Sequence, residues 1–179
     1  MNLHLLPIGK LEGRLLHDLA PALADIFGVP CQVESSGLNP DFAFHGERQQ
    51  YHSSEILMRM KDMLAPDCWR MLGVTAVDLY IPILTFVFGE AQIGGPCAVV
   101  SLHRLQEEFY GLPEDPSLLR DRLRKEAVHE LGHTINLTHC EDYRCAMAPS
   151  HAVEWIDLKE SWLCSVCHGK VFQDTGWNR

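Results

Sequence analysis

The sequence has no excess of positive charge and no long apolar run, and each absence excludes a class of protein. Lys and Arg number 15 against 24 Asp and Glu, which leaves a net charge of −9 at pH 7. A nucleic-acid-binding surface needs clustered positive charge, so we expect no nucleic-acid partner. No apolar stretch approaches the roughly 20 residues that a membrane-spanning helix needs, so we expect no membrane partner either.

The start of the chain also lacks the features of a secretory signal peptide. Residues 1–10 contain no basic region followed by a long apolar core. We therefore expect a cytoplasmic protein, and cysteines stay reduced in that compartment. A chain of 179 residues, of which 46% are hydrophobic, suits one core of sizeable extent, so we expect a single domain over residues 1–179.

What the sequence does contain is apolar periodicity that predicts alternating strands and helices. Strands are expected where apolar residues run together or alternate, at residues 2–8, 29–33, 74–81, 86–89 and 98–102. Helices are expected where apolar residues recur at helical spacing, at residues 11–27, 53–64, 118–135 and 154–164. Residues 168–179 are polar and are expected to be loosely held. Helices interleaved with strands in this order predict an α/β layer.

Residues 129–140 form the most informative stretch, His-Glu-Leu-Gly-His-Thr-Ile-Asn-Leu-Thr-His-Cys. His129 and His133 are four residues apart, so on a helix they share one face, roughly 5–6 Å from each other. Two imidazoles at that spacing can hold one zinc ion, with Glu130 beside the metal as a general base. His139 can join them only if the helix ends abruptly and the chain turns back. Asn136 suits such a turn, because after glycine asparagine best tolerates the left-handed conformation.

The short His-Glu-x-x-His pattern also arises by chance, as two surface histidines with a solvated glutamate between them. Three further observations favour a metal site. Apolar Val128, Leu131 and Ile135 surround the motif, a third histidine follows at the extended spacing, and Met147 lies in a turn-prone run shortly downstream. The nearby acids, Glu126, Glu141 and Asp142, are expected to be solvated.

The last quarter of the chain carries two cysteine pairs that predict a second metal site. Cys140-x4-Cys145 and Cys164-x2-Cys167 are separated by 18 residues, a spacing typical of structural four-thiolate zinc sites. The alternatives are unlinked thiols, disulfides if the protein were secreted, or a redox role for the second pair, which lacks the surrounding βαβ pattern. Because Cys140 directly follows His139, we expect the second zinc to anchor the segment that presents the third histidine. The two ligand sets predict about two zinc ions per chain.

The pattern His-Glu-x-x-His-x-x-Asn-x-x-His followed by Met147 resembles the metzincin zinc peptidases, although their pattern has glycine where Asn136 stands. The cysteine directly after the third histidine and the later Cys164-x-x-Cys167 resemble, more narrowly, the archaemetzincins. Residues 86–91 and 99–102 also look like the upstream strands of that family. The resemblance implies an α/β (α+β), metzincin-like fold, with a twisted mixed sheet and helices above a cleft. The upper part would span about residues 1–136 and a small, zinc-stapled lower part about residues 137–179.

The same resemblance implies a zinc-dependent peptidase of endopeptidase or aminopeptidase type, acting on peptides or proteins. Zinc lowers the pKa of its bound water to roughly 7, and Glu130 would take the proton and pass it to the leaving amine. Asn136 would form the turn, and Met147 would form a floor beneath the metal without binding it. An edge strand, at residues 86–90 or 98–102, would pair with an extended substrate.

Two other functions remain open from the sequence. The first is a zinc-stabilised protein-binding module with little or no activity, against which Glu130 argues, since a purely structural site needs no such carboxylate. The second is a nucleic-acid-binding zinc ribbon built on the cysteines. The net charge counts against the ribbon, although a basic run, expected to be a solvated helix face paired with nearby acids, is present at Arg120, Arg122, Arg124 and Lys125.

Overall fold

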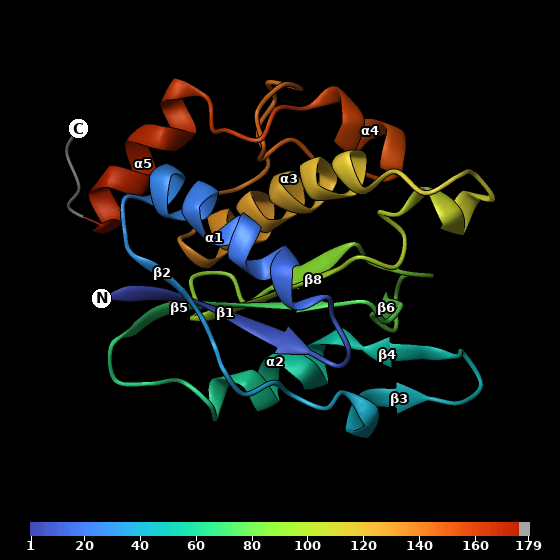
Figure 1. Ribbon diagram of the computed structural model, residues 1–179. Helices are drawn as coiled ribbons and strands as arrows, with labels where there is room; N and C mark the ends of the chain where they lie inside the picture. Colours follow the sequence, from blue (N-terminus) through green and yellow to red (C-terminus); the bar gives the residue numbers. More distant parts are fainter. Residues whose placement is uncertain (176–179) are drawn as a thin grey trace.

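A computed structural model describes residues 1–175 as a mixed α/β fold (Figure 1). The larger sheet has five strands in the order β2-β1-β5-β8-β7. Four of them run parallel, namely β1 (Asn2–Ile8), β2 (Cys31–Val33), β5 (Cys68–Thr75) and β8 (Cys97–Ser101). The fifth, β7 (Gly89–Ala91), pairs antiparallel with β8 and forms one edge of the sheet. The α/β class and the mixed sheet that the sequence predicts are confirmed.

Smaller elements flank this sheet. A second sheet of three short strands contains β3 (Phe44–His45), β4 (Gln50–His52) and β6 (Leu79–Tyr80). Single 3-10 turns occur at η1 (Asp41–Ala43) and η2 (Glu107–Tyr110).

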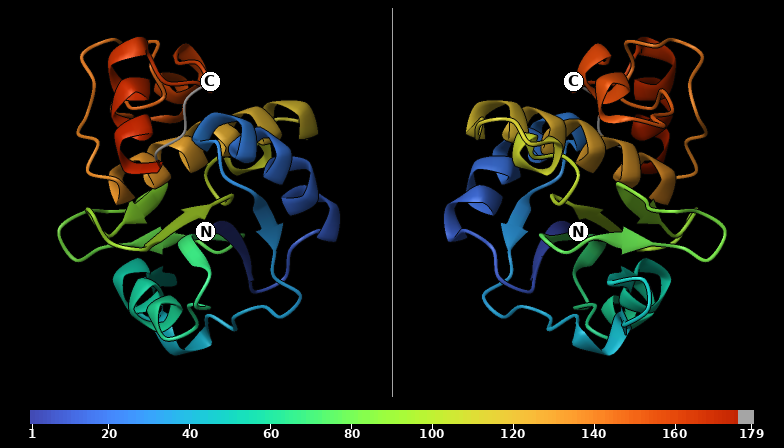
Figure 2. Two further views of the ribbon diagram at one scale, coloured as in Figure 1. Left: turned by 90° about the vertical axis from the view of Figure 1, so that its left-hand side faces the viewer. Right: turned by 90° about the vertical axis from the view of Figure 1, so that its right-hand side faces the viewer.

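Five α-helices divide residues 1–175 into layers. They are α1 (Gly13–Phe27), α2 (Ser53–Lys61), α3 (Pro116–Thr134), α4 (Val153–Leu158) and α5 (Ser165–Thr175). Helices α1 and α3 cover one face of the larger sheet and α2 covers the other, while the C-terminal segment with α4 and α5 lies beyond α3 (Figures 1 and 2). Helix α3 is therefore an inner layer.

The central strands are apolar on both faces because both faces are covered. Along β8, Ala98 and Val100 belong to the core shared with α1 and α3, whereas Cys97 and Val99 belong to the core under α2. All four side chains are fully buried. Such strands read as continuous apolar runs in the sequence, which explains why this one could be predicted.

The inner position of α3 explains its unusual composition. Its side chains are buried almost continuously from Arg122 to Thr134, including the charged Glu126 and Glu130. The helix begins where the Asp115 carboxylate accepts the backbone N–H groups of Ser117 and Leu118, at 3.0 and 2.9 Å. Polar residues in the second half of this helix, such as Glu126 and Glu130, therefore point into the protein rather than into solvent.

Several predicted boundaries are wrong. The strand predicted at residues 74–81 is two strands, β5 and β6, with a turn between them where Asp78 pairs with Arg104. The strand predicted at residues 86–89 begins only at Gly89, as β7. The helix predicted at residues 154–164 ends at Leu158, because Lys159 is extended and its side chain turns inward. The tail predicted to be loose forms α5 as far as Thr175, and residues 176–179 lie outside the described residues.

The sheet order also separates the two candidate substrate strands. Strand β8 lies between β5 and β7, so both of its edges are already paired. Strand β7 has one neighbour in the sheet and leaves one edge open. Within residues 1–175, no helix is long and apolar enough to cross a membrane.

Candidate active site

The three motif histidines converge on one point. Their ligand nitrogens all lie within 4.8 Å of one another, and Nε2 of His129 is 3.1 Å from Nε2 of His133. Two nitrogens bound to one tetrahedral zinc at about 2.0–2.1 Å would be about 3.3–3.4 Å apart, so this donor set fits a zinc ion. The fit is reached although His139 lies outside the helix.

Backbone carbonyls orient the two helical histidines. Nδ1 of His129 donates to the Ala146 carbonyl at 2.9 Å, and Nδ1 of His133 donates to the Leu137 carbonyl at 2.8 Å. A carbonyl only accepts, so each Nδ1 carries the proton and each Nε2 keeps its lone pair for a metal.

Asn136 makes the turn that brings His139 back. Helix α3 ends at Thr134, and Asn136 has φ of 62°, in the left-handed region. The Leu137 N–H returns to the Gly132 carbonyl at 3.0 Å, and the Gly94 N–H reaches the His133 carbonyl at 3.0 Å. Residues 137–140, which bring His139 back toward the helix, form no strand and are irregular.

Met147 lies directly against the helix that carries the histidines. Its side chain is fully buried, and a Cβ added at Gly132 would approach its sulfur to 2.3 Å. The Met147 carbonyl accepts the N–H of Cys140 at 3.0 Å. Met147 therefore contacts both the two-histidine helix and the segment that carries the third histidine.

Glu130 is buried between α3 and the edge strand β7. It is 6% exposed, and a Cβ added at Gly89 would lie 2.7 Å from its Cγ and 2.8 Å from its Oε1. Burial, helped by the carboxylates of Glu126 and Glu90, raises the pKa of Glu130 well above its ordinary value. A carboxylate with a raised pKa is suited to accept a proton.

A cleft of about 440 Å³ opens onto the metal ligands and Glu130. Residues 84–90 and residues 149–151 also line this cleft. A second groove of about 370 Å³ shares His139 and Pro149 with the cleft and is lined by Tyr143, Trp155 and Leu158. The accessible space therefore continues past His139.

Two further carboxylates line the cleft, and both have partners. Glu90 accepts the hydroxyls of Ser53 and Ser54, the latter at 2.8 Å. Glu126 is 3% exposed and lies 2.9 Å from the ammonium of Lys159. The prediction of a solvated Glu126 is wrong, because α3 is covered on that side by the C-terminal segment. Glu126 lies four residues before Glu130 and therefore on the same helix face. This spacing, which is not part of the motif, could have indicated from the sequence that Glu126 is buried beside the site.

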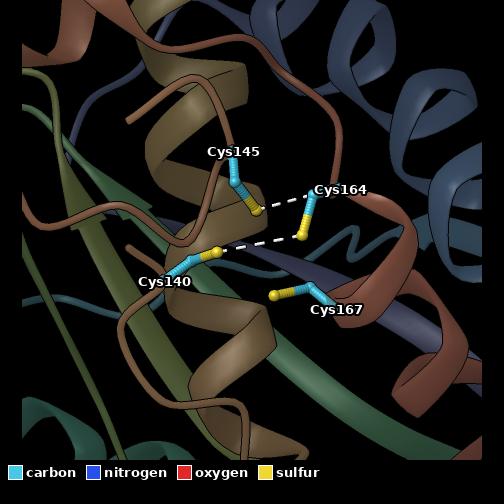
Figure 3. A group of neighbouring side chains, drawn as sticks. All are labelled: Cys140, Cys145, Cys164 and Cys167. Carbon is cyan, nitrogen blue, oxygen red and sulfur yellow. Dashed lines mark hydrogen bonds between the residues drawn. The ribbon is translucent and has the colours of Figure 1, made fainter. Parts of the chain in front are cut away.

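The four C-terminal cysteines form a second cluster (Figure 3). Their ligand atoms lie within 4.8 Å of one another, and the sulfurs of Cys140 and Cys164 are 3.8 Å apart. Sulfurs bound to one tetrahedral zinc at about 2.3 Å would be about 3.8 Å apart. All four are free thiols, so disulfides are not formed here. The donor set fits a closed structural zinc site.

The protonation of these thiols differs. A backbone hydrogen bond from Cys167 is the main cause that lowers the pKa of Cys164, whereas burial raises the pKa of Cys145 and Cys167. Zinc binding must therefore displace protons from at least the last two.

Two of the four residues in the basic run on α3 are buried against acids rather than open to solvent. Arg122 is buried and pairs with Glu107 at 2.6 Å and Asp157 at 2.7 Å. Lys125 is also buried and pairs with Asp121 at 2.6 Å. The predicted pairing with acids is confirmed for these two, but the predicted solvation is wrong.

We expect acidification to destabilise the protein when its histidine site is metal-free. Burial lowers the pKa of His129 well below the ordinary 6.5, and it also lowers those of His133 and His139. A lowered folded-state pKa contributes stability above 6.5, and this stability is lost as the pH falls through the lowered values. The raised pKa of Glu130 acts oppositely: its contribution is present below the ordinary 4.5 and is lost as the pH rises.

The measurement is the free energy of urea unfolding between pH 7.5 and 5.5, in Glu130→Gln so that the opposing titration is removed. The zinc-loaded form of the same variant is the control, since bound ligands cannot take protons freely. A free energy of unfolding that rises on acidification in the metal-free form would contradict the expected direction.

Comparison with known proteins agrees with this geometry. The family model of peptidase family M54 matches residues 39–173. The archaemetzincin of Methanocaldococcus jannaschii is 39% identical over 176 residues, covering 98% of this chain and 95% of the relative. The archaemetzincin of Haloquadratum walsbyi is 33% identical, over 96% of this chain and 100% of the relative.

Solved structures show the same fold. The archaemetzincin of Archaeoglobus fulgidus, complexed with malonate, has a TM-score of 0.81 at 35% identity and covers 95% of this chain and 99% of its own. A zinc-dependent peptidase from Methanocorpusculum labreanum has a TM-score of 0.83 at 30% identity, covering 94% and 99%. Since these likenesses span nearly the whole chain and include the residues that form both clusters, the chain belongs to the archaemetzincins of peptidase family M54, which are zinc-dependent peptidases.

Proposed function

We propose that this archaemetzincin is a cytoplasmic endopeptidase with two zinc ions per chain. In this proposal His129, His133 and His139 hold the catalytic zinc and Glu130 is the general base. The structural zinc is held by Cys140, Cys145, Cys164 and Cys167. One observation carries the proposal: the three imidazoles converge beside Glu130, a buried glutamate of α3.

Zinc bound at the histidines supplies a Lewis acid that acidifies a water molecule and polarises a substrate carbonyl. Glu130 takes the proton from the attacking water and delivers it to the leaving amine. Asn136 keeps His139 turned toward the helix, and Met147 supports the helix from below. The open edge of β7 pairs with an extended peptide by strand addition, which places the scissile bond over Glu130.

Endopeptidase action is favoured by the carboxylates of the cleft. An aminopeptidase needs an acidic group to hold the free α-ammonium of its substrate. In the described part of the chain, Glu90, Glu126 and Glu130 are the carboxylates that line the cleft. The first two are held by Ser53 and Ser54 and by Lys159, and the third is the proposed base. The continuation of the space past His139 also accommodates substrate on both sides of the metal.

The test uses zinc-loaded protein and a peptide library in two forms, with free ends and with acetylated and amidated ends. We expect internal cleavage of the blocked peptides. Cleavage restricted to free N-termini would establish an aminopeptidase, and no cleavage with both metals bound would favour the protein-binding module.

Metal content is a simpler test of the same proposal. Native mass spectrometry is expected to show two zinc ions per chain. A single zinc that resists removal and is held by the thiolates would contradict the catalytic assignment.

The assignment of the two parts of the chain belongs to the same proposal. Residues 1–136 and 137–179 form one peptidase domain, with no nucleic-acid partner. One buried cluster supports this, since Val128 and Leu131 of α3 pack in it with Met147 and Ile156.

Gly89→Ala is expected to impair catalysis more than stability. The new Cβ would lie 2.7 Å from the Val99 carbonyl and 2.7 Å from Cγ of Glu130, so either β7 or the glutamate must move. Overpacking costs about 1–3 kcal/mol, and misplacing a catalytic group by about 1 Å can lower the rate about 100-fold. The measurements are kcat on a blocked peptide and urea unfolding.

Gly46→Ala is the matched control, because nothing lies within 4 Å of a Cβ at that position. Wild-type kcat in Gly89→Ala would show that Glu130 is not packed against β7 as described.

A further inference from the structure

Lys159 is a fully buried cation that the sequence motif does not include. Its side chain is 0% exposed. Nζ lies 2.9 Å from Oε1 of Glu126 and donates to the carbonyls of Ala146 at 3.2 Å and Ala148 at 3.1 Å. The ammonium therefore donates hydrogen bonds to the two carbonyls and forms an ion pair with the carboxylate.

The ion pair with Glu126 explains only part of this arrangement. A buried charge is costly unless it is paired, so either residue alone would destabilise the fold. Pairing alone, however, does not require the two carbonyls. Ala146 and Ala148 are the residues on either side of Met147, so one ammonium fixes both ends of the turn beneath the histidines.

The Ala146 carbonyl connects this ammonium to the metal centre. The same oxygen accepts the Nδ1 proton of His129 at 2.9 Å. The direction of that carbonyl sets both the ring orientation and the tautomer of His129. Because the Lys159 ammonium and the His129 Nδ1–H both donate to this carbonyl, it has little freedom to rotate away from His129.

We propose that Lys159 is a positioning residue of the histidine metal site, which acts by holding the Ala146 carbonyl toward His129. The inference rests on the proposed function only in that zinc binds the three histidines. It assigns Lys159 no contact with substrate.

The alternative is that Lys159 merely fastens the C-terminal segment to α3. Arg122 provides a matched comparison, because it is also buried and also joins α3 to this segment, through Asp157 at 2.7 Å. Its other partners are Glu107 at 2.6 Å and the Leu105 carbonyl at 2.7 Å, so its hydrogen bonds and ion pairs go to groups other than the two alanines. A fastening role predicts the same outcome for both residues, whereas a positioning role predicts different ones.

The experiment compares Lys159→Met with Arg122→Met. Zinc affinity of the histidine site is measured by chelator competition, with the cysteine zinc retained, and thermal unfolding is measured in parallel. We expect Lys159→Met to weaken zinc binding about 10- to 100-fold, as loss of outer-shell partners does. Arg122→Met is expected to lower the melting temperature but to keep the wild-type affinity. Equal affinities in the two variants would overturn the proposal, whether both are weakened or both unchanged.

A double variant separates orientation from charge. Lys159→Met with Glu126→Gln removes both charges of the ion pair and so leaves neither of them buried without its partner. A loss of zinc affinity that remains in this variant is then attributed to the released carbonyls. Recovery of wild-type affinity in the double variant would overturn the proposal. The Nδ1 proton resonance of His129 is the second readout, and we expect it to move or broaden in both Lys159 variants and to stay in place in Arg122→Met.

The outcome is independent of peptidase activity. Zinc affinity is measured without substrate, so failure of the endopeptidase assignment would leave this test intact. Conversely, wild-type cleavage of blocked peptides together with unchanged zinc affinity in Lys159→Met would remove the inference and leave the proposed function standing.

Discussion

Glu130→Gln is expected to lower kcat on a blocked peptide about 100- to 10,000-fold, the range that a positioned general base contributes. Glutamine keeps the size of the side chain, so packing against Gly89 and burial in the cleft are preserved. It cannot accept a proton at neutral pH, and the step that fails is therefore proton transfer rather than folding or metal binding.

Zinc content is measured on the same preparation, and two zinc ions per chain should remain. Glu108→Gln is the control, because Glu108 is an exposed carboxylate on η2 and does not line the cleft. Cleavage at the wild-type rate by Glu130→Gln would mean that a contaminant or another site performs the reaction. Loss of both activity and zinc would mean that Glu130 maintains the site rather than acting in the reaction.

Cys167→Ser is expected to abolish the structural zinc site and, with it, tight zinc binding by the histidines. Structural zinc contributes about 10–16 kcal/mol of apparent binding free energy in small zinc domains. Cys167 lies on α5, far in sequence from the three histidines of the catalytic site. The cluster reaches the histidine site through Cys140, which directly follows His139, and through Cys145, which directly precedes Ala146. Cys140→Ser should behave in the same way, with an added local effect on that segment.

The measurement is zinc affinity at the histidines after the thiolate zinc has been lost, together with thermal unfolding. Cys31→Ser is the control, since Cys31 is a half-buried thiol on β2, outside both clusters. Histidine-site affinity that stays at the wild-type value in Cys167→Ser would show that the two metal sites are independent.

Local spacing explains why the two ligand sets could be predicted from the sequence. His129 and His133 are brought together by one turn of helix, and Cys164 and Cys167 by the start of another. These relations depend on residues a few positions apart. The left-handed turn at Asn136 could be predicted for the same reason, because backbone preference is a property of a single residue.

The supporting residues depend on tertiary structure and could not be predicted in this way. Lys159 and Glu126 meet across 33 positions of sequence, and Glu90 meets Ser54 across 36. A lysine in a sequence usually indicates a solvent-exposed position, so the burial of Lys159 could not be predicted from its residue type. Lys159 also follows the end of α4, which lies six positions before the predicted end, and its backbone is extended.

The adjacency of His139 and Cys140 has a consequence for the order in which the active site assembles during folding. The entropy of closing a flexible loop grows slowly, by about 0.6 kcal/mol for each doubling of its length. Joining Cys140 to Cys167 therefore costs little more than joining two much closer residues, and a bound metal can hold that loop closed. Once it is closed, His139 has no separate conformational search to make, since its neighbour is already fixed. The third ligand can thus be brought to the two-histidine helix by the same long-range closure that joins the cysteines.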